Sequence, residues 1–210
     1  MRMDELNSSE LGTLKYWEER YNNEIKNFNE HGDTGEIWFG EDIVDRLITW
    51  ITTNISKSQS IVDIGCGNGH ILVELAQMGY KNLTGLDYSE KGINLATAIA
   101  QRQDFDIKFQ VCDALEGLPE TYEVIHDKGT YDAISLSENS KESCEKYLNS
   151  VAEALDKGYF IITSCNWTES ELEKRFQQTF VLYETVPTPQ FKFGGKVGNV
   201  VSICVFKKKF

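Results

Sequence analysis

The stretch 61–70, with the sequence IVDIGCGNGH, constrains the fold of this chain more than any other. A short apolar run ends in alternating glycines, and apolar residues at helical spacing follow at once. This order predicts a buried strand, a tight glycine turn and the first turn of a helix. Because glycine has no side chain, such a turn lets a ligand lie directly on the main chain. We therefore expect residues 61–70 to bind a nucleotide-like group.

Strands and helices alternate over the rest of the chain. This alternation predicts an α/β fold, in which helices cover both faces of a parallel sheet. The last two β-rich runs have no helical pattern between them, so these strands pair antiparallel or lie apart. Beyond 61–64, the expected strands are 82–87, 107–112, 122–126, 159–164, 180–186 and 199–206. The expected helices are 8–30, 70–78, 90–101 and 141–155, with one more after Gly40 and one after Thr168.

The length of 210 residues is enough for one sizeable core. We interpret residues 1–210 as a single domain, with 1–57 as an N-terminal helical cap and 58–210 as the sheet core that binds the ligand. In the cap, Trp17 and Tyr21 recur at helical spacing. We expect this helix to cover the ligand, with plain core packing of the two aromatics as the alternative.

Charge and cysteine usage exclude several classes of protein. The formal net charge of −12 argues against a nucleic-acid binder that works through phosphate contacts. The charge suits a basic partner, although it could serve solubility alone. No apolar run approaches the ~20 residues that a membrane helix needs. The 5 cysteines are scattered and the histidines are not spaced as ligands, so we expect reduced thiols in a cytosolic protein and no metal site.

The spacing of the glycines indicates which kind of nucleotide the turn binds. The dinucleotide fingerprint is G-x-G-x-x-G, and Gly65 and Gly67 match its first two positions. The third position is His70, and the third glycine comes one place early, at Gly69. No Gly-Lys-Ser/Thr follows, so the phosphate-binding P-loop is excluded as well. The ionisable neighbours are Asp63 and His70, which suits a ligand that has a positive centre and no phosphates.

Two acids follow later strands of the expected sheet. Asp87 ends the second strand, where an acid holds the ribose hydroxyls in sheets of this type. Asp113 follows the third strand and could accept a hydrogen bond from an adenine amino group, while the main chain at Cys112 reaches a ring nitrogen. A capping or loop aspartate is the alternative for Asp87, and an ordinary loop aspartate is the alternative for Asp113.

These residues resemble the class I S-adenosylmethionine-dependent methyltransferases. Residues 62–69 look like the first motif of that family, and Asp87 like its ribose-binding acid. The resemblance implies a Rossmann-like, seven-stranded, mostly parallel sheet with an antiparallel last strand, and S-adenosylhomocysteine as the product. The cofactor-binding residues that it implies are Trp38, Asp63, Gly65, Gly67, Asn68, Asp87, Tyr88, Cys112, Asp113 and Ala114.

A closer resemblance covers nearly the whole chain. It is to the lysine methyltransferases that modify eukaryotic translation elongation factor 1-alpha, and it implies methyl transfer to one lysine of that factor in the cytoplasm. We expect a monomer that acts on this protein partner, with neither nucleic acid nor membrane involved; a nuclear fraction would be compatible. The motifs that carry the resemblance are 11–13, 32–41, 127–136, 162–168 and 193–196.

The acceptor side of the site is predicted from the end of the fourth strand. Asp127 follows that strand at the carboxyl edge, where ligands lie in such sheets. We expect Asp127 to orient the incoming ammonium, and a salt bridge to Lys128 is the alternative. Tyr131 or Trp38 could hold the methylated cation by a cation–π contact, although core packing is as compatible for either. Trp167 is a further candidate on this side.

Other functions remain in competition on the same fold, because a fold does not fix a function. A nucleic-acid methyltransferase is disfavoured by the acidic charge and by the absence of an Asn/Asp-Pro-Pro-aromatic signature. A small-molecule methyltransferase is permitted by the fold alone. A non-catalytic binding module would not need the intact glycine turn and Asp87.

Overall fold

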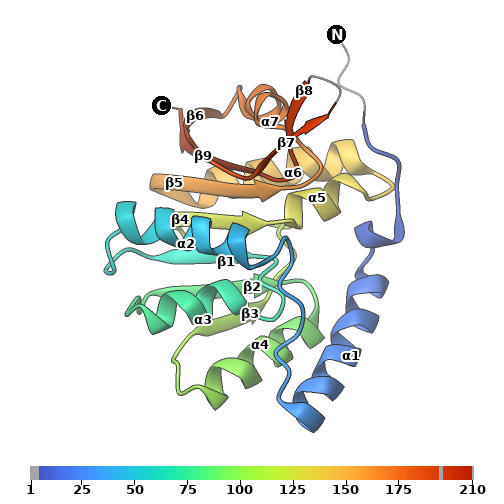
Figure 1. The fold of residues 1–210 in the computed structure, drawn as a ribbon, viewed down its shortest axis with the longest axis vertical. Helices are drawn as coiled ribbons and strands as arrows, with labels where there is room; N and C mark the ends of the chain where they lie inside the picture. Colours follow the sequence, from blue (N-terminus) through green and yellow to red (C-terminus); the bar gives the residue numbers. More distant parts are fainter. Residues whose placement is uncertain (1–4, 194–195, 210) are drawn as a thin grey trace.

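The computed structural model describes residues 5–193 and 196–209, and its centre is a seven-stranded sheet with the order β3-β2-β1-β4-β5-β9-β6 (Figure 1). Neighbouring strands from β3 to β5 run parallel, whereas β9 is antiparallel to both β5 and β6. The predicted antiparallel pairing of the last two sheet strands is therefore confirmed. The strands are β1 Ile61–Ile64, β2 Leu83–Asp87, β3 Lys108–Val111, β4 Tyr122–Lys128, β5 Leu155–Ser164, β6 Phe180–Val186 and β9 Ser202–Lys208.

Helices cover both faces of this sheet, as the alternation predicts. On one face α6 and α7 bury a cluster of aliphatic and aromatic side chains, and on the other face α2 and α3 do so. A third cluster joins α1 to α4 beside β2 and β3. The helices are η1 Glu10–Gly12, α1 Leu14–His31, α2 Glu41–Asn54, α3 His70–Gln77, α4 Glu90–Arg102, α5 Thr130–Ser135, α6 Ser140–Ala154 and α7 Glu169–Phe176.

Several helix starts follow the capping signals in the sequence. The Ser89 side chain accepts a hydrogen bond from the main chain of Gly92 at the start of α4. At the start of α7, the main chain of Thr168 donates to the carboxylate of Glu171 over 2.9 Å, as a capping box requires.

The N-terminal segment lies over the carboxyl edge of the sheet. Figure 1 shows α1 on the side toward which the arrows of β4 and β5 point. Ahead of α1, the main-chain N–H of Ser9 donates to the carbonyl of Leu136 at the end of α5. A side chain at Gly12 would come within 2.4 Å of that same carbonyl oxygen, so glycine permits this close approach.

The structure contains elements that the sequence does not predict. The stretch after β4 reads as a loop, yet Thr130–Ser135 form α5, which begins after Gly129 in the left-handed conformation. A two-stranded hairpin of β7 Gln190–Phe193 and β8 Lys196–Asn199 precedes β9. Gly194 and Gly195, part of the 193–196 motif, lie outside the described residues. The first helix also begins later than expected, at Leu14, after the short turn η1.

No helix in the described part of the chain is long and apolar enough to cross a bilayer.

Candidate active site

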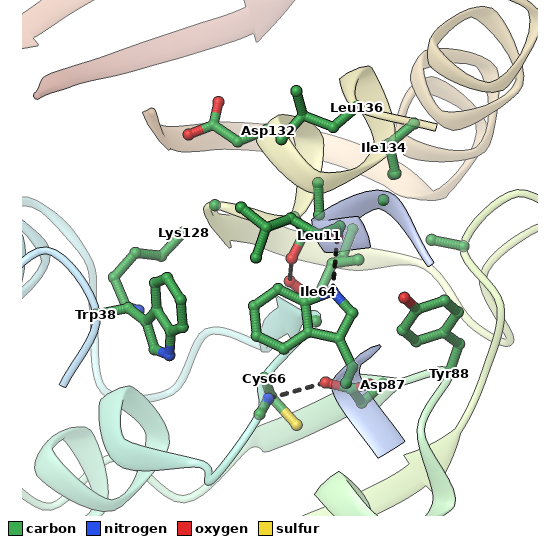
Figure 2. A pocket seen from close by; sticks show the side chains of 18 of the residues that line it. Leu11, Trp38, Ile64, Cys66, Asp87, Tyr88, Lys128, Asp132, Ile134 and Leu136 are labelled. Carbon is green, nitrogen blue, oxygen red and sulfur yellow. Dashed lines mark hydrogen bonds between the residues drawn. The ribbon is translucent and has the colours of Figure 1, made fainter. Parts of the chain in front are cut away.

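A cavity of about 250 Å³ opens at the carboxyl edge of the sheet, beside the glycine turn. Its walls come from η1 and α1, from the loop before α2, from the ends of β1 to β4, from α5 and from the loop after β5. Figure 2 shows Asp87 and Tyr88 at one end of this cavity and Asp132 at the other, with Leu11 and Ile64 between them. This is the edge at which open α/β sheets bind their ligands.

The glycine turn is shaped by positive φ angles that other residues rarely adopt. Gly65, Gly67 and Gly69 have φ angles of 65°, 55° and 76°. A side chain at Gly65 would also lie only 1.9 Å from Oγ1 of Thr130, which donates to the carbonyl of Ile64 over 2.7 Å. The turn therefore needs glycine for its conformation and for its packing against α5.

Asp87 connects the glycine turn to the end of β2. Its carboxylate accepts hydrogen bonds from the main-chain amides of Gly67, at 3.0 Å, and Ser89, at 2.8 Å. The residue is 4% exposed, and burial raises the pKa of Asp87 to about 6. Tyr88 lines the same end of the cavity, and burial raises the pKa of its phenol. The predicted ribose site thus has a rigid acid beside an aromatic ring.

The residues predicted to meet the adenine line the cavity after β3. Cys112, Asp113 and Ala114 all contribute to its wall. One oxygen of Asp113 accepts a hydrogen bond from the amide of Leu115 over 2.9 Å, so it also closes a local turn. The structure thus brings these residues together with Asp87 and Tyr88, as the order of the strands requires.

Asp63 lies behind the glycine turn, outside the large cavity. It is 4% exposed, and its Oδ1 lies 2.7 Å from Nδ1 of His126 on the neighbouring strand. It also lines a small pocket of about 20 Å³ together with His70 and Lys128. Asp63 therefore pairs with His126 between neighbouring strands and does not line the large cavity.

Asn68 ties the glycine turn to the loop before α2. Its amide nitrogen donates to the carbonyls of Thr34, at 3.0 Å, and Glu36, at 3.3 Å, and its oxygen accepts from the amide of His70. Asn68 also lines the cavity. The motif 32–41 is therefore attached to the glycine turn through this side chain.

Aromatic side chains from the N-terminal segment form one wall of the cavity. Trp17, Tyr21 and Trp38 all line it. The ring centroids of Trp17 and Trp38 lie 5.4 Å apart, and the indole N–H of Trp17 donates to the carbonyl of Leu11 over 2.8 Å. Arg20 lies over the Trp38 ring at 5.6 Å. The helix expected to cover the ligand does border the cavity.

Asp127 and Tyr131 do not reach the cavity, contrary to the catalytic roles predicted for them. Asp127 is fully buried, and its carboxylate accepts from the amides of Thr130 and Tyr131, both at 2.9 Å, and from the hydroxyl of Tyr147. Tyr131 is 1% exposed and packs against Phe176. The alternative, a salt bridge from Asp127 to Lys128, is also not among the ion pairs of the described residues. Asp127 instead satisfies the first amides of α5, because the strand runs directly into that helix.

The alternative of core packing is correct for Tyr131 and applies to Trp167 as well. Trp167 is 5% exposed and belongs to the cluster under α6 and α7. The guanidinium carbon of Arg175 lies 3.6 Å from the centroid of its ring. Trp167 therefore supports the loop after β5 from inside the core.

Four further residues that line the cavity, where the acceptor side was predicted, were missed by sequence reasoning. They are Lys128 from the end of β4, Asp132 from α5, and Cys165 and Asn166 from the loop after β5. All four lie within the motifs 127–136 and 162–168. The length of these two motifs was the sequence signal that could have indicated these residues. Asp132 could not be assigned to the cavity, because Thr130–Ser135 was not recognised as a helix.

Comparison with known sequences identifies close relatives. A family described as "Methyltransferase domain" matches residues 55–205. The mouse protein named "EEF1A lysine methyltransferase 2" is 45% identical over 214 residues, covering 98% of this chain and 87% of its own length. The human protein of that name is 46% identical over 206 residues, covering 95% and 87%. "Protein-lysine N-methyltransferase EFM4" of Saccharomyces cerevisiae is 40% identical over 223 residues, covering 98% and 97%.

Comparison with solved structures supports the fold. Magnesium protoporphyrin IX methyltransferase from Synechocystis, crystallised with bound SAM, gives a TM-score of 0.65 at 19% identity, covering 90% of this chain and 97% of that one. The PH0226 protein from Pyrococcus horikoshii gives a TM-score of 0.65 at 16% identity, covering 88% and 99%. The predicted class I methyltransferase sheet is thereby confirmed.

Proposed function

We propose that this chain, which belongs to the methyltransferase family of the EEF1A lysine methyltransferases, transfers methyl groups from S-adenosylmethionine to a lysine of elongation factor 1-alpha. The observation that carries this proposal is the likeness to the mouse, human and yeast relatives over nearly the whole chain. The names of the mouse and human proteins state the acceptor, and the yeast name states protein-lysine methylation.

The chemistry of the cavity lining fits S-adenosylmethionine. Asp87 offers a carboxylate to ribose hydroxyls, and Tyr88, Cys112 and Ala114 offer flat or small surfaces to a purine ring. Acidic side chains outnumber cationic ones among the described residues that line the cavity, which suits a sulfonium and disfavours phosphates. The acids are Glu24, Glu36, Asp87, Asp113 and Asp132, and the cation is Lys128.

The cofactor, when bound, supplies a methyl group that is activated by its positive sulfur. The acceptor must be a neutral amine, and a free lysine has a pKa of about 10.4, so its deprotonation at pH 7 costs about 4.6 kcal/mol. The apolar wall formed by Leu11, Ile134 and Leu136 excludes water from the amine and lowers this pKa. The remaining task of the chain is alignment of the amine with the methyl group.

The cellular setting follows from the proposed partner. As the resemblance to the lysine methyltransferases of elongation factor 1-alpha implies, we place the reaction in the cytoplasm, with the chain acting as a monomer on this protein and on neither nucleic acid nor membrane. The net charge of −12 favours encounter with a basic surface on the acceptor.

The direct test is incubation of the chain with elongation factor 1-alpha and isotopically labelled S-adenosylmethionine. We expect label on a lysine of the factor and a gain in its intact mass that corresponds to whole methyl groups. Parallel reactions with total RNA, or with a protein-free extract of small metabolites, test the two other acceptor classes. Label in either of those reactions and none on the factor would overturn the proposal.

A further inference from the structure

We propose that the carboxylate of Asp132 binds the ammonium of the acceptor lysine and keeps its nitrogen in place, and that the nitrogen attacks the methyl group after one of its protons has passed to this carboxylate or to solvent. This assignment rests on the proposed function, and it names a residue for the task that Asp127 cannot perform from inside the core. Asp132 lies on α5 and lines the cavity, at the end remote from Asp87 (Figure 2). Because Asp87 is placed to bind the ribose, the methyl group and its acceptor belong toward the other end.

The carboxylate of Asp132 is held in a fixed position. Its Oδ1 accepts a hydrogen bond from the hydroxyl of Ser164, and its Oδ2 accepts from the amide of Cys165 over 2.8 Å. Each carboxylate oxygen has a second acceptor site, so both bonds leave capacity for an ammonium. The group is therefore positioned before the acceptor arrives, which reduces the entropic cost of binding.

The charge of Asp132 is not balanced by a cation from the chain. Within residues 5–193 and 196–209, the ion pairs do not include Asp132, and the residue is only 5% exposed. Burial accordingly raises the pKa of its carboxyl group. A buried carboxylate without a cationic partner is costly, and an incoming ammonium would offset that cost.

The other acids of the cavity are already engaged. Arg20 forms ion pairs with both Glu24 and Glu36. Asp87 accepts two main-chain hydrogen bonds at the predicted ribose end. Asp113 accepts from the amide of Leu115 and lies near Asp87, because the amide of the preceding Cys112 donates to the Asp87 carbonyl over 2.9 Å. Asp132 is thus the acid that combines burial, the absence of an internal cation and a place opposite the ribose end.

The surroundings of Asp132 suit a lysine side chain. Ile134 follows it on α5, Leu136 comes directly after that helix, and Leu11 faces them from the N-terminal segment (Figure 2). These side chains would contact the aliphatic stem of a lysine while the carboxylate meets its charged end. A neutral acceptor such as a hydroxyl would gain less from this arrangement, because hydrogen bonds between charged partners are the stronger ones.

Steady-state kinetics of Asp132→Asn and Ser164→Ala, with elongation factor 1-alpha as acceptor, test this assignment. Loss of a charge-assisted hydrogen bond predicts that Asp132→Asn lowers kcat/KM for the factor about tenfold to hundredfold, mainly through KM. Its affinity for S-adenosylmethionine, measured by calorimetry, should stay within about twofold of the original. Asp132→Glu, which keeps the charge, should recover part of the loss.

Ser164→Ala is the matched control for a purely structural role. Besides its bond to Asp132, the Ser164 hydroxyl accepts from the amides of Asn166 and Trp167, so this variant weakens the loop at least as much as Asp132→Asn does. If Asp132 binds the ammonium, Ser164→Ala should have the smaller effect on KM. Equal effects of the two variants would overturn the assignment and leave Asp132 with a structural role.

A second measurement changes the acceptor and compares how the unaltered chain and Asp132→Asn bind it. Once mass spectrometry has located the modified lysine, the factor can be made with methionine at that position, which removes the ammonium. The unaltered chain should bind this factor about tenfold less tightly, and Asp132→Asn should bind both forms of the factor equally. Equal binding of both forms by the unaltered chain would contradict the assignment. If no lysine is modified at all, the proposed function itself fails, which is a distinguishable result.

Discussion

The carboxylate of Asp87 accepts a hydrogen bond from the main-chain amide of Gly67 over 3.0 Å, although the two residues belong to different βα units. The bond joins the glycine turn after β1 to the carboxyl end of β2, which runs parallel beside it. The other carboxylate oxygen of Asp87 accepts a hydrogen bond from the amide of Ser89 over 2.8 Å. Asp87 therefore organises two loops and faces the cavity at the same time.

Replacement of Asp87 by alanine should weaken the binding of S-adenosylmethionine by about 1.5–3 kcal/mol, because charge-assisted hydrogen bonds to the ribose would be lost. Asp87→Asn keeps the shape and one acceptor, so we expect an intermediate loss. Calorimetric titration with the cofactor measures both. Unchanged affinity in Asp87→Ala would remove this residue from the binding site.

Gly65→Ala should be far more damaging than another glycine substitution at a positive φ angle. At Gly65 the new methyl group would lie 1.9 Å from Thr130 Oγ1, whereas at Gly117, where φ is 107°, nothing lies within 4 Å. Gly117→Ala should therefore cost only the conformational strain, about 1–2 kcal/mol of unfolding free energy. Gly65→Ala should lose more stability and most of its cofactor affinity. Urea unfolding and calorimetry compare them, and similar losses would contradict the steric argument.

The buried carboxylate of Asp127 should contribute to stability through the start of α5. In Asp127→Asn, the new amide N–H would face the N–H of Tyr131 or the hydroxyl of Tyr147, which now donate to the carboxylate. Because two donors cannot bond to each other, we expect a loss of about 1–3 kcal/mol in the free energy of unfolding. Tyr147→Phe removes one donor without introducing another, so its loss should be smaller. Urea unfolding at pH 8 measures both. If Asp127→Asn were as stable as the original chain but had lost its activity, the structural role would be contradicted and a catalytic role of Asp127 supported.

The same residue should make stability depend on pH. Burial raises the pKa of Asp127 from 3.8 to about 7, so the folded chain keeps a proton that the unfolded chain releases. The stability that this proton provides is fully present below pH 3.8 and is lost as the pH rises through about 7. The difference in unfolding free energy between the original chain and Asp127→Asn should therefore shrink from pH 4 to pH 8. A difference that is constant with pH would show that Asp127 titrates normally.

Much of the sheet can be predicted from sequence because its signals are local. Apolar runs, the glycine turn and the caps at Ser89 and Thr168 each act within a few residues. The position of β9 between β5 and β6 has no such signal, since pairing of distant strands is decided by packing. The hairpin of β7 and β8 is different, because two short runs separated by Gly194 and Gly195 are a local hairpin signal that was overlooked.

In the candidate site, too, some residues follow from local sequence signals and others depend on packing between distant segments. Gly65, Gly67, Asp87 and Cys112–Ala114 were predictable because the end of each strand in a parallel sheet falls at one edge. Which acid after β4 faces the cavity was not predictable, because it depends on the direction of α5. Asp63 likewise lies opposite His126 through the register of β1 and β4, and sequence does not fix that register.

Arg175 should stabilise the chain by joining two walls of the cavity from behind. The Arg175 side chain is only 6% exposed, and its guanidinium lies 3.6 Å from the carboxylate of Glu5, ahead of the cavity residue Leu11. The guanidinium also stacks on Trp167, which follows the cavity residue Cys165 in the loop after β5. Lysine cannot stack as a planar cation, so Arg175→Lys should cost about 1–2 kcal/mol of unfolding free energy. Arg46→Lys is the control, because Arg46 pairs with Asp42 at the surface and donates to the carbonyl of Pro187, so this change should cost less than Arg175→Lys. Urea unfolding measures both variants, and equal stability of the two would show that the stack on Trp167 contributes nothing.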